Sequence, residues 1–109
     1  MDEIVKQAEK LGEAIARHAR CKAFAEAREA FGNDEAARKL QEEYDAAVDT
    51  LQKKGAAGEA LEPEEKRREV ELRGRLASNQ TLAALIRAQA DFHELMAAVN
   101  EALERAIRL

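Results

Sequence analysis

The chain has 109 residues, of which 18 are basic and 22 acidic, giving a net charge of −4. This length suffices for one small domain over residues 1–109 and is too short for two. The apolar runs are too short to span a bilayer, and the acidic balance argues against direct DNA binding, which needs a concentrated basic surface. One proline, five glycines and 37% charged residues predict an all-α protein of about five helices rather than a β-rich one.

The N-terminal third predicts two amphipathic helices. Apolar residues recur at spacings of three and four over residues 4–15, and Arg17 and Arg20 suit the negative C-terminal end of that helix. A second, shorter helix carries Phe24 on its apolar stripe and ends at Gly32, which acts as a stop signal.

The middle of the chain predicts a helical hairpin. Asn33 or Asp34 caps a third helix whose apolar stripe covers residues 37–51. Two glycines within four residues favour a loop over residues 55–61, and Pro63 suits the first turn of a fourth helix. Because the fourth helix has few apolar residues, we expect it to be largely solvated and to form a protruding hairpin with the third.

The last helix carries the longest packing pattern in the chain. Ser78-Asn79 is a capping signal at its start, and we favour Ser78 over Asn79 as the N-cap. Apolar and neutral residues then alternate at spacings of three and four, a repeat typical of a helix-packing seam. The candidate interface on this seam comprises Leu82, Leu85, Gln89, Phe92, Met96, Val99, Asn100 and Leu103. A further set widens the seam on one side, namely Ile86, His93, Asn100 and Ile107.

This seam has two interpretations. It could pair two copies of the chain, or it could be used entirely within a monomeric bundle. We favour a homodimer, because symmetric dimers are the commonest assemblies and a small bundle with exposed helices is marginally stable. Asn100 would then fix register or oligomeric state; the alternative is that it caps a neighbouring helix end.

Few residues carry reactive chemistry. His18 and Cys21 are three apart on a predicted helix and could face one metal ion, but no third ligand lies near them, so a structural role is preferred. His93 and Glu94 diverge because they are adjacent on a helix, and no triad can be built around Ser78. We therefore predict no catalytic residue, no metal site and no cofactor.

Segments spread along the chain match a known family. The matching residues are Ala8, Leu11, Gly12, Ala14, Ile15 and Ala16, then Phe24 and Ala27, then Asp34, Leu40 and Tyr44, then Gly58 and Asn79, and finally Ala88, Gln89, Phe92, Leu95, Val99 and Asn100. In this order and spacing, the chain resembles the YlbF/YmcA (YheA-like) family of small all-helical bacterial regulatory proteins.

The resemblance implies a non-catalytic cytoplasmic protein that forms dimers or larger assemblies. Members of the family act in competence, biofilm and sporulation control, and some affect RNA processing through ribonuclease Y. Some of their complexes hold iron–sulfur clusters on cysteines. The single Cys21 does not supply the four thiolates that such a cluster needs, so we expect no cluster on this chain alone.

The residues and the resemblance together predict an interaction module that acts by binding, as a homo-oligomer and with other regulatory proteins. The single cysteine and the absence of a signal-peptide pattern favour the cytoplasm. One alternative is an adaptor associated with RNA processing, although the basic run Lys66-Arg67-Arg68 is interleaved with glutamates and predicts a self-paired surface. Another is a ligand- or metal-sensing module that uses His18, Cys21 or the inter-helix cleft.

Overall fold

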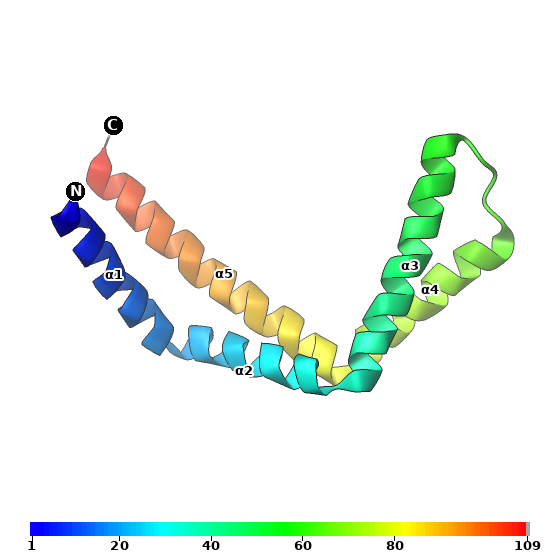
Figure 1. Ribbon diagram of the computed structural model, residues 1–109, viewed down its shortest axis with the longest axis horizontal. Coiled ribbons are helices and arrows are strands. Elements are labelled where there is room, and N and C mark those ends of the chain that lie inside the picture. The colour runs from blue at the N-terminus through cyan, green and yellow to red at the C-terminus, as the bar shows by residue number, and fades with distance from the viewer. Residues whose placement is uncertain (109) are drawn as a thin grey trace. The chain divides into compact units, whose positions relative to one another are not determined.

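The computed structural model describes residues 1–108, and over that range the protein is all-α, as its composition predicts. It consists of the helices α1 (Asp2–Arg17), α2 (Ala19–Asn33), α3 (Glu35–Ala57), α4 (Pro63–Ser78) and α5 (Gln80–Ile107), which Figure 1 shows in chain order. The contacts divide the chain into two compact units. We call Met1–Glu29 with Leu85–Leu109 the terminal unit and Ala30–Ala84 the hairpin unit. Leu109 itself lies outside the described residues.

The hairpin unit begins at a capped helix start. Asp34 leaves the helical backbone, and its Oδ1 accepts a hydrogen bond from the Ala37 amide at 3.0 Å. This is the N-cap arrangement that satisfies an otherwise free amide of the first turn. The second carboxylate oxygen accepts a hydrogen bond from the Thr81 hydroxyl at 2.7 Å, which ties the start of α3 to the start of α5. Of the two residues proposed as the N-cap of α3, Asn33 and Asp34, the structure shows Asp34 in that role.

The loop predicted over residues 55–61 is wrong at its start, because α3 continues through Gly55 to Ala57. Gly58 is the residue that ends the helix: it has a φ of 72°, a left-handed conformation that glycine adopts without steric cost. The turn is closed by backbone hydrogen bonds from Gly58 to Gly55 and from Glu59 to Lys54. Gly55 alone, flanked by good helix formers, does not stop the helix.

The tip of the hairpin is held by a shared carboxylate. Glu65 accepts a hydrogen bond from the Lys54 ammonium at 2.6 Å and another from the backbone amide of Glu62 at 3.0 Å. The Lys54 bond lowers the pKa of Glu65, and the same bond raises the pKa of Lys54. Farther along, the Tyr44 hydroxyl donates to Glu69 at 3.1 Å, which raises the pKa of Tyr44. These bonds join α3 to α4 as the predicted hairpin.

The buried residues of the hairpin unit lie near its base. Ala37 in α3 and Leu72 in α4 are fully buried, and Leu82 at the start of α5 is 3% exposed. The α4 helix is therefore less solvated than its composition indicates, since one leucine is buried completely while Val70 is 56% exposed. The hairpin unit depends on few large side chains.

The predicted N-cap of α5 is wrong by one residue. Ser78 remains in α4, where its hydroxyl donates to the Gly74 carbonyl at 3.0 Å. Asn79 has an extended backbone, and its Oδ1 accepts from the Leu82 amide at 3.0 Å. Asn79 therefore caps α5, because it is the residue that leaves the helical conformation.

The first two helices are separated at His18. His18 has an extended backbone, so α1 ends at Arg17 and Arg20 belongs to the first turn of α2. The Nδ1 atom of His18 accepts a hydrogen bond from the Arg20 amide at 3.0 Å and so satisfies one free amide of α2. Gly32 does not end α2, which continues to Asn33.

Leu72→Ala tests the core of the hairpin unit. Because Leu72 is fully buried, its truncation is expected to lower the free energy of unfolding by about 2–5 kcal/mol. Urea unfolding followed by circular dichroism measures the loss. Val70→Ala is the matched control, since Val70 is exposed on the same helix and its truncation should cost less than ~1 kcal/mol. Equal losses for the two variants would contradict this description of the core.

Asp34→Asn tests the cap in a pH-dependent way. The hydrogen bond from the Ala37 amide, followed by that from Thr81, lowers the pKa of Asp34 below its ordinary value of 3.8. The ionised carboxylate therefore stabilises the fold above pH 3.8, and this contribution is lost as the pH falls through the folded-state pKa. The stability difference between wild type and Asp34→Asn should shrink below pH 3.8, as measured by urea unfolding at several pH values. A difference that stays constant into acid would rule out the carboxylate as the source.

Candidate interaction surface

The α5 helix carries two neighbouring seams, and the chain itself covers one of them. The inner seam, formed by buried or half-buried residues, comprises Leu85, Ala88, Phe92, Leu95 and Val99. The outer seam, formed by residues that are exposed apart from the half-buried Met96, comprises Ile86, Gln89, His93, Met96, Asn100, Leu103 and Ile107. Both sets repeat at spacings of three and four, so each follows one line along the helix.

This division separates the residues of the predicted interface. Leu85, Phe92 and Val99 lie on the inner seam, and Leu82 is buried at the start of α5 in the hairpin unit. The remaining members are on the outer seam, namely Gln89, Met96, Asn100 and Leu103. Ile86 and Ile107, expected only to widen the predicted seam, are 65% and 62% exposed. Ile86, His93, Asn100 and Ile107 follow one another at intervals of seven residues, and this repeat is the sequence signal for the outer seam.

Phe92 of the inner seam contacts Phe24 of α2. The rings of Phe24 and Phe92 are 5.4 Å apart between centroids and tilted by 33°, a favourable aromatic geometry. The Arg20 guanidinium donates to the backbone carbonyl of Asp91 at 3.2 Å and lies 3.7 Å from the Glu94 carboxylate. The Arg28 guanidinium lies 5.7 Å from the centroid of the Phe24 ring. Phe92 is therefore used inside the chain, and its ring is half-buried rather than enclosed.

The outer seam is uncharged along its whole length. The charged residues of α5 lie elsewhere around the helix: Arg87, Asp91, Glu94, Glu101, Glu104 and Arg105. Within the seam, Leu103 is 48% exposed, and the polar residues Gln89, His93 and Asn100 are also exposed. A stripe free of charge on an otherwise charged helix is typical of a surface that another helix covers.

The α1 helix has the same character. None of its residues is buried, and only Ile15 is half-buried. At 100° per residue, its charged residues fall on one half of the helix: Asp2, Glu3, Lys6, Glu9, Lys10, Glu13 and Arg17. The other half exposes Ile4 by 73%, Val5 by 49% and Leu11 by 38%. This exposed apolar half of α1 is a second candidate interaction surface.

The predicted ligand pair is not brought together as a metal centre. His18 uses its Nδ1 to accept the Arg20 amide at the α1–α2 junction, and Cys21 is a half-buried free thiol in α2. Within residues 1–108, no group of three or more His, Cys, Asp or Glu side chains is placed to hold a metal ion. His93 and Glu94 are both exposed on α5, with His93 on the outer seam.

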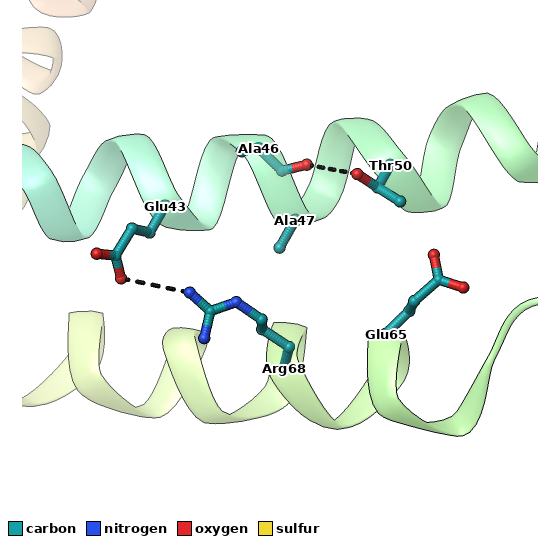
Figure 2. A pocket seen from close by; sticks show the side chains of 6 residues that line it. All are labelled: Glu43, Ala46, Ala47, Thr50, Glu65 and Arg68. Carbon is teal, nitrogen blue, oxygen red and sulfur yellow. Dashed lines mark hydrogen bonds and ion pairs between the residues drawn. The ribbon is translucent and has the colours of Figure 1, made fainter.

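The cleft between α3 and α4 is a shallow groove of about 280 Å³. Figure 2 shows the residues that line it, which are Glu43, Ala46, Ala47, Thr50, Glu65 and Arg68. Its polar groups already have partners: Arg68 is 3.7 Å from Glu43, and the Thr50 hydroxyl donates to the Ala46 carbonyl at 3.0 Å. The volume lies at the lower limit of small-molecule pockets. The groove therefore offers a ligand little beyond two alanine side chains.

The basic run on α4 lies among acidic partners. Ion pairs join Arg67 to Glu64 at 3.0 Å, Arg68 to Glu43 at 3.7 Å, Arg73 to Glu69 at 3.1 Å and Arg75 to Glu71 at 2.6 Å. Each pair places a carboxylate where a phosphate would have to bind. This arrangement matches the predicted self-paired surface.

Phe92→Ala tests the inner seam. Because the ring is half-buried, we expect a loss of about 2–3 kcal/mol, less than the ~3–5 kcal/mol typical of an enclosed phenylalanine. Phe24→Ala and the double variant complete a mutant cycle, whose coupling should be about 0.5–1.5 kcal/mol. Urea unfolding measures all three variants. Additive losses without coupling would show that the two rings do not stabilise each other.

Comparison with known proteins identifies the family of the chain. Within residues 1–108, no helix is both long enough and apolar enough to cross a bilayer. A search among individual curated proteins finds no match. Residues 4–108 match a family described as "Control of competence regulator ComK, YlbF/YmcA", and this match covers all five helices. The chain therefore belongs to the YlbF/YmcA family.

Proposed function

We propose that this protein is a non-catalytic regulatory module of the cytoplasm that acts by binding a second copy of itself and other regulatory proteins. The family is described by control of a competence regulator, and this description supports a regulatory role. The single observation that carries the proposal is the uncharged, exposed surface of the terminal unit, on α1 and the outer seam of α5.

Covering that surface would stabilise the protein. Burying a side chain such as Ile4, Leu103 or Ile107 contributes about 1.5–3 kcal/mol relative to leaving it in water. Most helix stability in proteins comes from packing of an apolar face, so α1, which has no buried residue, would gain stability from a partner. Binding would therefore remove the apolar half of α1 from solvent.

The polar groups of the chain support binding rather than bond-making chemistry. His18 caps a helix, Glu65 holds the hairpin tip, and Glu69 accepts hydrogen bonds from Tyr44 and Arg73. Each of these groups has a structural partner on its own chain. The regulatory effect would then depend on which protein covers α1 and the outer seam of α5.

A tagged pull-down from the native cell tests the proposal, with and without ribonuclease and with mass spectrometry as the readout. We expect protein partners in stoichiometric amounts that survive ribonuclease. Leu103→Glu should reduce their recovery at least tenfold, because it places a charge on the outer seam. Ala98→Glu is the matched control, since Ala98 is exposed on the charged side of α5, and it should leave recovery unchanged.

Two results would contradict the proposal. Partners lost on ribonuclease treatment would identify an RNA-associated adaptor instead. Recovery of the tagged chain alone would leave no protein partner and would favour a small ligand bound between the helices.

A further inference from the structure

We infer that His18 is a pH-sensitive switch at the junction of α1 and α2. The neutral imidazole holds the two helices bent, and the protonated imidazole lets them join into one straight helix. The bend sets the direction of α1 and therefore of its exposed apolar residues Ile4, Val5 and Leu11. The consequence for partners rests on the proposed function, whereas the bend itself does not.

Three hydrogen bonds at one residue make the bend. His18 has an extended backbone, with a φ of −67° and a ψ of 142°, between two helical segments. Its amide donates to the Ile15 carbonyl at 3.0 Å, and its carbonyl accepts from the Lys22 amide at 3.1 Å. Its Nδ1 accepts from the Arg20 amide at 3.0 Å. The imidazole therefore serves as the side-chain N-cap of α2.

Only the neutral imidazole makes the third of these bonds. A neutral imidazole has one nitrogen that accepts a hydrogen bond, whereas both nitrogens of the protonated ring are donors. Histidine is the side chain that ordinarily changes its charge between pH 5 and 8. As the pH falls through this range, the Arg20 amide loses its acceptor in the bent chain. Acid therefore disfavours the bend, since the bent form binds a proton less readily than a form without the cap.

The sequence at the junction is compatible with a straight helix. Residues 16–21 contain neither glycine nor proline, and their alanines and arginines are good helix formers. In a continuous helix, the Arg20 amide would donate to the carbonyl of Ala16, four residues earlier. This amide thus has a partner in either form, but only the bent form needs an unprotonated Nδ1.

The charged groups around the imidazole do not replace the lost bond. The cations Arg17, Arg20 and Lys22 lie within four residues of it on its own two helices. On α5, the Arg20 guanidinium donates to the backbone carbonyl of Asp91 at 3.2 Å and lies 3.7 Å from the Glu94 carboxylate. Glu94 is therefore engaged with an arginine rather than with the imidazole.

Straightening the junction moves α1 rather than α2. The α2 helix is held on α5 by the Arg20 contacts and by the rings of Phe24 and Phe92, whose centroids are 5.4 Å apart. The α1 helix has no buried residue that would hold it in place. Under the proposed function, a partner that fits the bent form would bind more weakly in acid.

Nuclear magnetic resonance of the purified full chain tests the switch between pH 8 and pH 5. The Cα chemical shift of His18 reports the ratio of its extended to its helical form. We expect this ratio to fall about fivefold on acidification, the factor that corresponds to the loss of one helix N-cap. The change should follow the titration of the His18 ring and be accompanied by a shift of the Arg20 amide. A ratio that stays constant over this range would overturn the inference.

Three variants identify the group responsible. His18→Asn keeps a side-chain acceptor that does not titrate, so it should remain bent at pH 5. His18→Ala removes the acceptor and should have, already at pH 8, the reduced ratio that wild type reaches in acid. His93→Asn removes the other histidine and should retain the transition. A transition that persists in His18→Asn would assign it to another group and refute the switch.

Partner recovery at pH 7.5 and pH 5.5 tests the consequence for binding. On acidification, wild type should lose about fivefold in recovery relative to His18→Asn, if the bent form alone binds. Equal losses for the two proteins would show that the bend does not control binding. A chain that recovers no partner at either pH would contradict the proposed function, while the chemical shifts still decide the switch.

Discussion

The protein buries little of its apolar surface within one copy, and most of its properties follow from that constraint. Its buried residues are Ala37, Leu72, Leu82 and Ala88, two of which are alanines. A small domain gains its stability from buried apolar area, so a core of this size leaves a narrow margin over chain entropy. Many of its large apolar residues are exposed instead, on the uncharged half of α1 and on the outer seam of α5. Under the proposed function, a bound partner would cover these exposed apolar residues.

The two units meet this constraint differently. In the hairpin unit, α3 and α4 are joined by bonds such as Lys54–Glu65 and Tyr44–Glu69, and the charged side chains of α4 largely pair within the unit. Exposed ion pairs contribute little stability each, but they leave few groups seeking an external partner. The terminal unit differs, because in the described part of the chain only its inner seam contacts another helix. The uncharged half of α1 and the outer seam of α5 are exposed. The proposed binding surface therefore lies on the terminal unit.

Much of the fold follows from local patterns in the sequence. The five helices, the Asp34 cap and the hairpin could be predicted, because each depends on residues within a few positions of one another. The errors lie at helix ends where two nearby residues could each serve as the cap or stop. Asn79 caps α5 instead of Ser78, and Gly58 ends α3 while Gly55 does not. The candidate surface was predicted only in part. Periodicity finds the apolar and neutral residues of α5, but it cannot tell that Phe92 faces Phe24 while Leu103 stays exposed, since that depends on a distant helix.

The most direct test of the account is amide hydrogen exchange of α1 and α5 as a function of protein concentration. We expect α1, which has no buried residue in one copy, to exchange quickly in dilute solution and to become protected as the protein concentration rises. Amides of the hairpin unit around Leu72 should be equally protected at low and at high protein concentration, since that core lies within one chain. Exchange of α1 that is independent of concentration would contradict the claim that a second copy completes the terminal unit.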